Sequence, residues 1–112
     1  MSRSDDLRLL DILDASDRIA RLVARGHAAF DDDESLQPAI ERMLEIIGES
    51  ANALSEEVCG DLTGIDWEDI RRLRIVLAHH YHRVDPDQVW TMATQEVPAT
   101  AALIRTQRPE LS

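Results

Sequence analysis

Three residues in the second half of the chain have the types and the spacing for phosphodiester chemistry. Arg74, His79 and Tyr81 form an Arg-x4-His-x-Tyr pattern. A guanidinium pairs with phosphate through two parallel N–H donors, and an imidazole can give or take a proton near pH 7. The pattern therefore suits the binding and cleavage of a phosphodiester, although so short a motif is weak by itself.

The surroundings of this pattern are basic in an otherwise acidic chain. The 112 residues carry a net charge of -10, yet no carboxylate lies between Ile70 and Val84. This stretch, the basic segment, contains Arg71, Arg72, Arg74 and Arg83 and the histidines His79, His80 and His82. The acidic balance argues against broad nucleic-acid binding, which needs many cationic side chains, but it leaves room for a narrow phosphate site.

Helix geometry restricts how these residues could cooperate. On an ideal helix Arg74 and His79 differ in direction by about 140°, whereas Arg74 and Tyr81 lie within about 20° of each other. The helix could unwind near His79, the arginine side chain could bend, or a second copy could complete the site across a two-fold axis. We favour a bent side chain together with a dimeric site. The plain alternative is a solvated basic face on which His79 stabilises a helix C-terminus.

Composition predicts one all-α domain spanning residues 1–112. The hydrophobic share is 44%, with few aromatic residues and four glycines, which favours a helical core of Leu, Ile, Val and Ala. Cys59 is the single cysteine, so an intrachain disulfide is excluded. The start of the chain lacks a signal-peptide pattern, and we expect a cytoplasmic protein. The clustered histidines lack a regular ligand spacing, so we expect no metal and no other cofactor.

Hydrophobic periodicity predicts a small up-and-down bundle of four main helices. The first begins at Ser4 with an acidic first turn and carries apolar residues as far as Phe30, and the second runs from Ser35 to near Gly60. Asp66 is the expected cap of the third helix, and the pair Asp85-Pro86 begins the fourth. Pro98 should kink or divide this last helix.

Four segments resemble the HepT-like branch of the HEPN superfamily, in order and at the expected separations. They are Glu41-Arg-Met-Leu-Glu-Ile-Ile-Gly-Glu-Ser50, Ile65-Asp-Trp-Glu-Asp-Ile70, Leu73-Arg-Ile-Val-Leu-Ala-His-His-Tyr81 and Val84-Asp-Pro-Asp-Gln-Val-Trp90. The resemblance covers about Leu7 to Arg105. It implies a helical bundle that dimerises and a metal-independent endoribonuclease whose motif residues are Arg74 and His79.

The same resemblance implies a toxin of a toxin–antitoxin pair. The antitoxin would be a small nucleotidyltransferase that silences the toxin by attaching AMP to Tyr81, and the substrate would be RNA. The remaining basic side chains of the segment are candidates for RNA binding or support: Arg71, Arg72, His80, His82 and Arg83. The family usually has a polar residue after the motif arginine, where this chain has Ile75. The alternative is therefore a weakly active or inactive helical partner that binds and orients a nucleotidyltransferase or its substrate.

Overall fold

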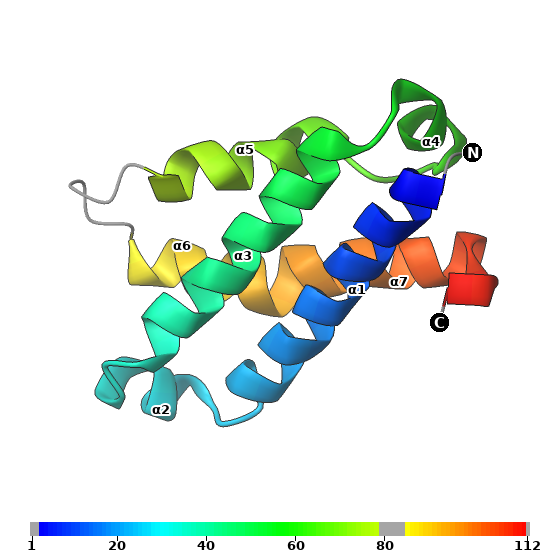
Figure 1. Ribbon diagram of the computed structural model, residues 1–112. Coiled ribbons are helices and arrows are strands. Elements are labelled where there is room, and N and C mark those ends of the chain that lie inside the picture. Colours follow the sequence, from blue (N-terminus) through cyan, green and yellow to red (C-terminus); the bar gives the residue numbers. More distant parts are fainter. Residues whose placement is uncertain (1–2, 79–84, 112) are drawn as a thin grey trace.

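The computed structural model describes residues 3–78 and 85–111, and every regular element in these ranges is a helix (Figure 1). The helices are α1 (Arg3–Val23), α2 (His27–Asp32), α3 (Leu36–Ala53), α4 (Glu56–Asp61), α5 (Trp67–Ala78), α6 (Pro86–Thr91), the π-helical turn η1 (Met92–Glu96), α7 (Val97–Gln107) and the 3-10 turn η2 (Pro109–Leu111). The all-α fold predicted from the sequence is confirmed. None of the described helices is long and apolar enough to cross a bilayer.

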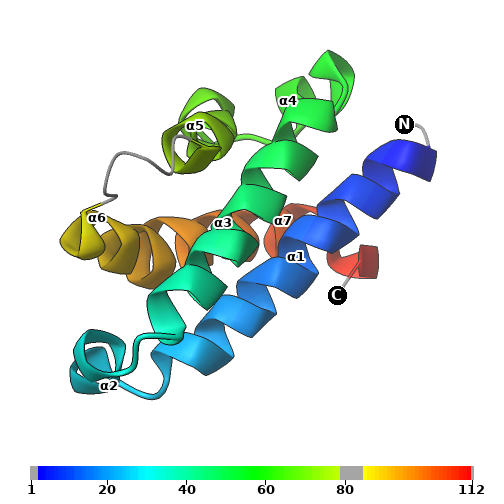
Figure 2. The same ribbon diagram turned by 60° about the vertical axis from the view of Figure 1, so that its left-hand side comes forward.

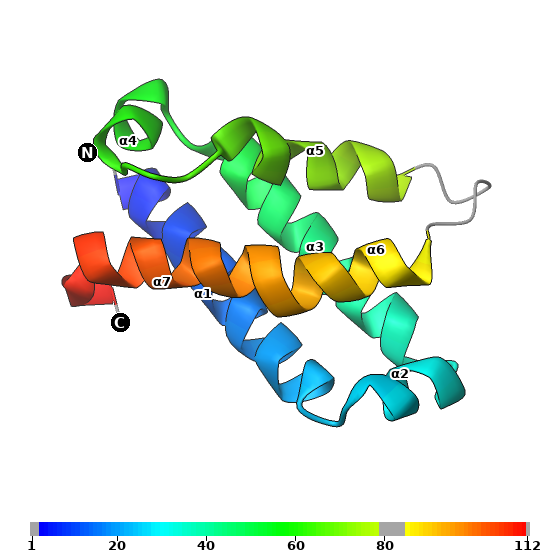
Figure 3. The ribbon, with the colours of Figure 1, turned by 180° about the vertical axis from the view of Figure 1, so that it is seen from behind.

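Helix α3 is the centre of the arrangement. Helix α1 packs along one side of it and α5 along the other (Figure 2). The nearly continuous rod formed by α6, η1 and α7 crosses behind the antiparallel pair α1 and α3 (Figures 1 and 3). The apolar stripes of these helices meet in one core, whose largest fully buried members are Leu9, Ile12, Ile19, Ile40, Leu44, Ile47, Val58, Val89 and Ile104. Each buried aliphatic side chain of this size contributes about 1.5–3 kcal/mol.

Two helices end earlier than the apolar periodicity predicts. Gly26 follows α1 with φ of 96°, a left-handed conformation that glycine adopts without strain, so Phe30 belongs to the separate helix α2. Similarly, α3 gives way to α4 at Ser55, whose Oγ accepts a hydrogen bond from the Val58 N–H at 3.3 Å. Apolar spacing continues through both breaks, which is why periodicity alone does not reveal them.

The irregularity predicted at Pro98 occurs just before it. Pro98 is the second residue of α7, and the preceding turn η1 is π-helical, with the Val97 N–H donating to the Met92 carbonyl five residues back. Proline has no N–H and cannot donate a hydrogen bond to the preceding turn. A wider π-helical turn just before Pro98 therefore does not sacrifice a backbone hydrogen bond that Pro98 could have made.

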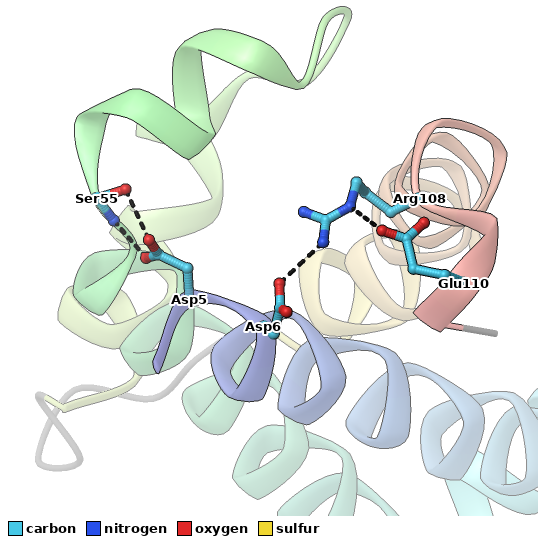
Figure 4. Close-up of polar contacts among 5 residues, drawn as sticks. All are labelled: Asp5, Asp6, Ser55, Arg108 and Glu110. Atoms are coloured by element: carbon cyan, nitrogen blue, oxygen red, sulfur yellow. Dashed lines mark hydrogen bonds and ion pairs between the residues drawn. The ribbon is translucent and has the colours of Figure 1, made fainter. Parts of the chain in front are cut away.

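Carboxylates in the first turn of α1 connect it to distant parts of the chain (Figure 4). The Asp5 carboxylate is buried and accepts hydrogen bonds from the Ser55 N–H and Oγ, both at 2.9 Å. The neighbouring Asp6 accepts from Arg108 at 2.9 Å, and Arg108 also donates to Glu110 at 2.7 Å. Hydrogen bonding to Glu110 and then Asp6 raises the pKa of Arg108. The predicted acidic first turn of α1 thus also forms tertiary hydrogen bonds, to Ser55 and to Arg108.

We expect Asp5→Ala to destabilise the fold by about 1–3 kcal/mol, because it leaves the part-buried Ser55 donors without their acceptor. The melting temperature, measured by circular dichroism, should fall by several degrees. The matched control is Asp32→Ala, at an exposed aspartate of α2. Equal melting temperatures for the two variants would show that the link from Asp5 to Ser55 contributes nothing.

Candidate functional site

Helix α5 carries the first part of the basic segment. It begins after Asp66, whose Oδ1 accepts a hydrogen bond from the Asp69 N–H at 3.2 Å, as the sequence predicted. Helix α6 begins after Asp85, which caps it by accepting from the Asp87 N–H at 3.0 Å, again as predicted. The intervening candidates His79, His80, Tyr81, His82 and Arg83 lie outside the described residues. The observable part of the site is therefore the arginine group of α5.

Arg74 is half-buried on the last turns of α5, and its guanidinium has unused hydrogen-bonding capacity. Its Nε is buried and has no hydrogen-bond partner within the described chain. A buried donor without an acceptor carries the full cost of its desolvation, about 1–3 kcal/mol or more for a charged group. Because the Nε is closed to solvent, an incoming phosphate would pair with the remaining guanidinium nitrogens of this half-buried side chain.

The backbone of Arg74 is held against α3 at Gly48. A Cβ built on Gly48 would lie 2.6 Å from the Arg74 backbone N and 3.2 Å from the Cβ atoms of Arg74 and Leu73. Only glycine fits so close an approach of two helices. The sequence analysis gave Gly48 no role. The available signal was an isolated glycine inside a strongly amphipathic helix, which often marks a close packing contact.

The two arginines that precede Arg74 have partners of their own. Arg71 donates to the Cys59 Sγ at 3.1 Å and to the Ala51 carbonyl at 3.5 Å, and so ties α5 to α4 and α3. Burial raises the pKa of the Cys59 thiol, although the nearby Arg71 acts in the opposite direction. The thiol is therefore held in its neutral, unreactive form at neutral pH.

Arg72 points to solvent and forms ion pairs within α5. Its guanidinium lies 3.0 Å from Glu68 and 3.7 Å from Asp69, and its side chain is 60% exposed. Exposed pairs of this kind contribute little to stability and are easily exchanged for another anion. Arg74 therefore differs from both neighbours: Arg71 is used in packing and Arg72 is locally neutralised.

These observations define an all-α fold in which the second half of α5 carries an arginine whose buried Nε has no acceptor among the residues described. Comparison with known proteins gives the family. Residues 12–106 match the family described as Ribonuclease HepT-like, so the chain belongs to the HepT-like family.

Individual relatives agree with this assignment. The chain is 30% identical over 102 residues to a Thermococcus cleftensis protein named Probable ribonuclease HepT, a match that covers 88% of this chain and 91% of the relative. Two Methanocaldococcus jannaschii proteins carry the name Putative RNase. One is 33% identical over 66 residues, covering 59% of this chain and 54% of its own length, and the other is 25% identical over 91 residues, covering 80% and 84%. No solved structure matches the chain.

The contact at Gly48 predicts a large effect from a single methyl group. Gly48→Ala should destabilise the protein by about 1–3 kcal/mol, because the new Cβ meets the Arg74 backbone rather than a flexible side chain. Chemical denaturation monitored by circular dichroism measures this loss.

Gly60→Ala is the matched control, since Gly60 lies in helix α4 with open space around the position of a Cβ. Alanine favours helix over glycine, so this variant should be as stable as the parent or slightly more stable. If Gly48→Ala behaves like Gly60→Ala, the close approach of α3 and α5 does not hold Arg74 in place.

Proposed function

We propose that this HepT-like chain is a metal-independent endoribonuclease and the toxin of a toxin–antitoxin pair. The observation that carries the proposal is the half-buried Arg74, whose buried Nε has no partner within residues 3–78 and 85–111 and whose backbone is held by Gly48. It is supported by membership of a family described as ribonucleases and by a basic segment that contains no carboxylate. RNA supplies the anionic phosphate that such an arginine can bind.

In the proposed reaction His79 and Arg74 have separate roles. The His79 imidazole takes the proton of a ribose 2′-hydroxyl, and the resulting alkoxide attacks the adjacent phosphorus. The bond to the 5′-oxygen breaks, and that oxygen leaves with a proton supplied by an imidazolium. The products are a 2′,3′-cyclic phosphate and a free 5′-hydroxyl. Arg74 neutralises the charge that grows on the phosphoryl oxygens in the transition state.

The proposed working form is a homodimer in which two copies of the Arg71–Arg83 stretch face each other. One small basic segment in a chain of charge -10 produces a weak field, and two copies in a shared cleft would produce a stronger one. His80, His82 and Arg83 are the proposed RNA-supporting residues, and Arg72 could join them by exchanging its exposed carboxylate partners for phosphate. Arg71 has less freedom, because its donors are used in packing.

Arg74→Ala and His79→Ala should each lower RNA cleavage at least about 100-fold, the effect expected for loss of a transition-state donor or an acid–base group. Cleavage of a labelled RNA and growth of cells that express each variant are the measurements. The parent should remain active in the presence of a chelator. Two variants as active as the parent would contradict the assigned roles, and a parent inhibited by the chelator would contradict the metal-independent reaction.

Mixing the two variants tests whether the site spans two chains. If Arg74 of one copy works with His79 of the other, a mixed dimer contains one site with both residues intact, and mixing should restore part of the activity. Retained inactivity of the mixture, with mixed dimers demonstrated by mass spectrometry, would place both residues of each site on one chain.

We further propose that a nucleotidyltransferase antitoxin silences the toxin by attaching AMP to Tyr81. The phenol is seven residues after Arg74, so on a continued helix the added phosphate would lie on nearly the same side as the guanidinium and compete with RNA for it. After coexpression, mass spectrometry should find AMP on Tyr81, and Tyr81→Phe should keep its ribonuclease activity while escaping neutralisation. Complete neutralisation with unmodified Tyr81 would instead indicate inhibition by binding.

The competing function is a weakly active or inactive partner that orients the nucleotidyltransferase. The specific observation in its favour is Ile75, an apolar residue directly after Arg74. A purified dimer that binds RNA and its partner without cleaving RNA would favour this second function. Gain of cleavage on Ile75→Asn would identify the apolar residue as the cause.

A further inference from the structure

The end of α1 and the start of α3 form the two walls of a groove on the surface. Its volume is about 470 Å³, within the range of ~300–1,000 Å³ that is usual for ligand sites. Each wall supplies residues at positions i, i+3 and i+4, which share one face of a helix. The residues that line the groove are Arg18, Arg21 and Leu22 from α1 and Ala39, Arg42 and Met43 from α3.

The floor of this groove is apolar. Leu22, Ala39 and Met43 are half-buried, and Leu22 and Met43 also pack against the core. A methionine side chain is flexible and polarisable, so this floor can adapt its shape to an apolar group that enters the groove. Burial of such a group would be favourable, because it removes apolar surface from water on both sides.

The rim of the groove is cationic on both walls. Arg18, Arg21 and Arg42 are exposed, and they are three of the 12 basic side chains in the chain. The Arg18 Nε lies 3.3 Å from an oxygen of Asp14. The Arg42 guanidinium lies 3.5 Å from Glu45, and Arg21 has no ion pair within the described residues. Exposed ion pairs contribute little to stability, so these arginines can exchange their partners for other carboxylates.

We propose that this groove binds an acidic segment of another protein, with one large apolar side chain on the floor and carboxylates on both sides of it. The arginines of the two walls receive the carboxylates, because a guanidinium pairs with a carboxylate through two parallel donors. Leu22 and Met43 cover the apolar side chain. The rim repels a basic segment, and an acidic segment without an apolar residue leaves the floor exposed to water.

RNA is a poorer fit for this groove than a peptide. Sites for single-stranded RNA combine cationic side chains with aromatic rings on which the bases stack, and none of the described lining residues is aromatic. Since α1 and α3 are antiparallel, Asp14 and Glu45 both lie beyond the same end of the groove (Figure 1). A strand that continued past this end would bring its phosphates next to two carboxylates, which repel them.

The groove is separate from the arginine group of α5. It is lined by α1 and α3, and α5 packs along the other side of α3 (Figure 2). The inference therefore does not rest on the proposed ribonuclease function, and its test measures binding rather than cleavage.

Selection from a random peptide library displayed on phage, with the immobilised full chain as the target, tests the chemistry of the occupant. The enriched peptides should share a large apolar residue with aspartate or glutamate on both sides of it. Lack of enrichment would overturn the proposal, and so would enriched peptides that are basic or that lack the apolar residue.

Substitutions in the groove test where the peptide binds. Binding of the most enriched peptide, labelled with a fluorophore, is measured by fluorescence anisotropy. Arg21→Glu should weaken binding at least about tenfold, because a carboxylate on the rim repels those of the peptide. Met43→Gln, which puts a polar amide on the floor, should weaken binding several-fold. Circular dichroism should show both variants folded.

The matched control is Arg8→Glu, at an exposed arginine of the same helix that lies about 20 Å from Arg21 along the helix axis. It changes the net charge as much as Arg21→Glu does, so it should bind the peptide like the parent. Equal loss of binding in these two variants, or no loss in Arg21→Glu and Met43→Gln, would overturn the proposal. So would a labelled oligouridylate that binds the parent more tightly than the peptide and is released by Arg21→Glu, since the groove would then be an RNA site.

Discussion

The close approach of α3 and α5 at Gly48 is the constraint on which the candidate site depends. With the Arg74 backbone N only 2.6 Å from where a Cβ would stand, neither helix can shift without losing this contact. The Arg74 side chain is half-buried next to this contact, and its Nε is removed from water without an acceptor among the described residues. The backbone contact thus fixes the position of the arginine whose unsatisfied guanidinium is the basis of the proposed function.

Local features of the fold could be predicted from the sequence because they depend on nearby residues. Asp66 and Asp85 act as caps through N–H groups two or three residues ahead, and the buried stripes follow the helical period. The break at Gly26 and the separate start of α4 at Ser55 were missed. Apolar spacing continues through both, and the Ser55 position is also held by Asp5, fifty residues earlier, which periodicity cannot indicate.

For the site, the sequence singled out Arg74 through the Arg-x4-His-x-Tyr pattern and the family resemblance, but it could not show which contacts distinguish Arg74 from Arg71 and Arg72. By residue type alone, Arg71, Arg72 and Arg74 are three similar members of one basic segment. Their difference comes from what lies beside each: Cys59 from α4 for Arg71, Glu68 one helical turn away for Arg72, and, in the part of the chain that the structure describes, no acceptor for the Arg74 Nε. The first and third are tertiary effects. The assignments of His79 and Tyr81 remain predictions from the sequence.

The acidic charge balance of the chain makes it unusual that the Arg74 Nε has no acceptor among the described residues. In a chain with 22 acidic and 12 basic residues, a surface arginine readily finds a carboxylate, as Arg105 does with Asp17 and Arg108 with both Asp6 and Glu110. For Arg74 two conditions hold together: the sequence has no carboxylate nearby, and within the described residues the fold brings no acceptor to its Nε. Residues 70–84 meet the first condition, and at the backbone contact with Gly48 the two helices are too close for even one added Cβ. Because the net charge of -10 disfavours general binding of a polyanion, a segment without carboxylates would be a favoured position for a phosphate.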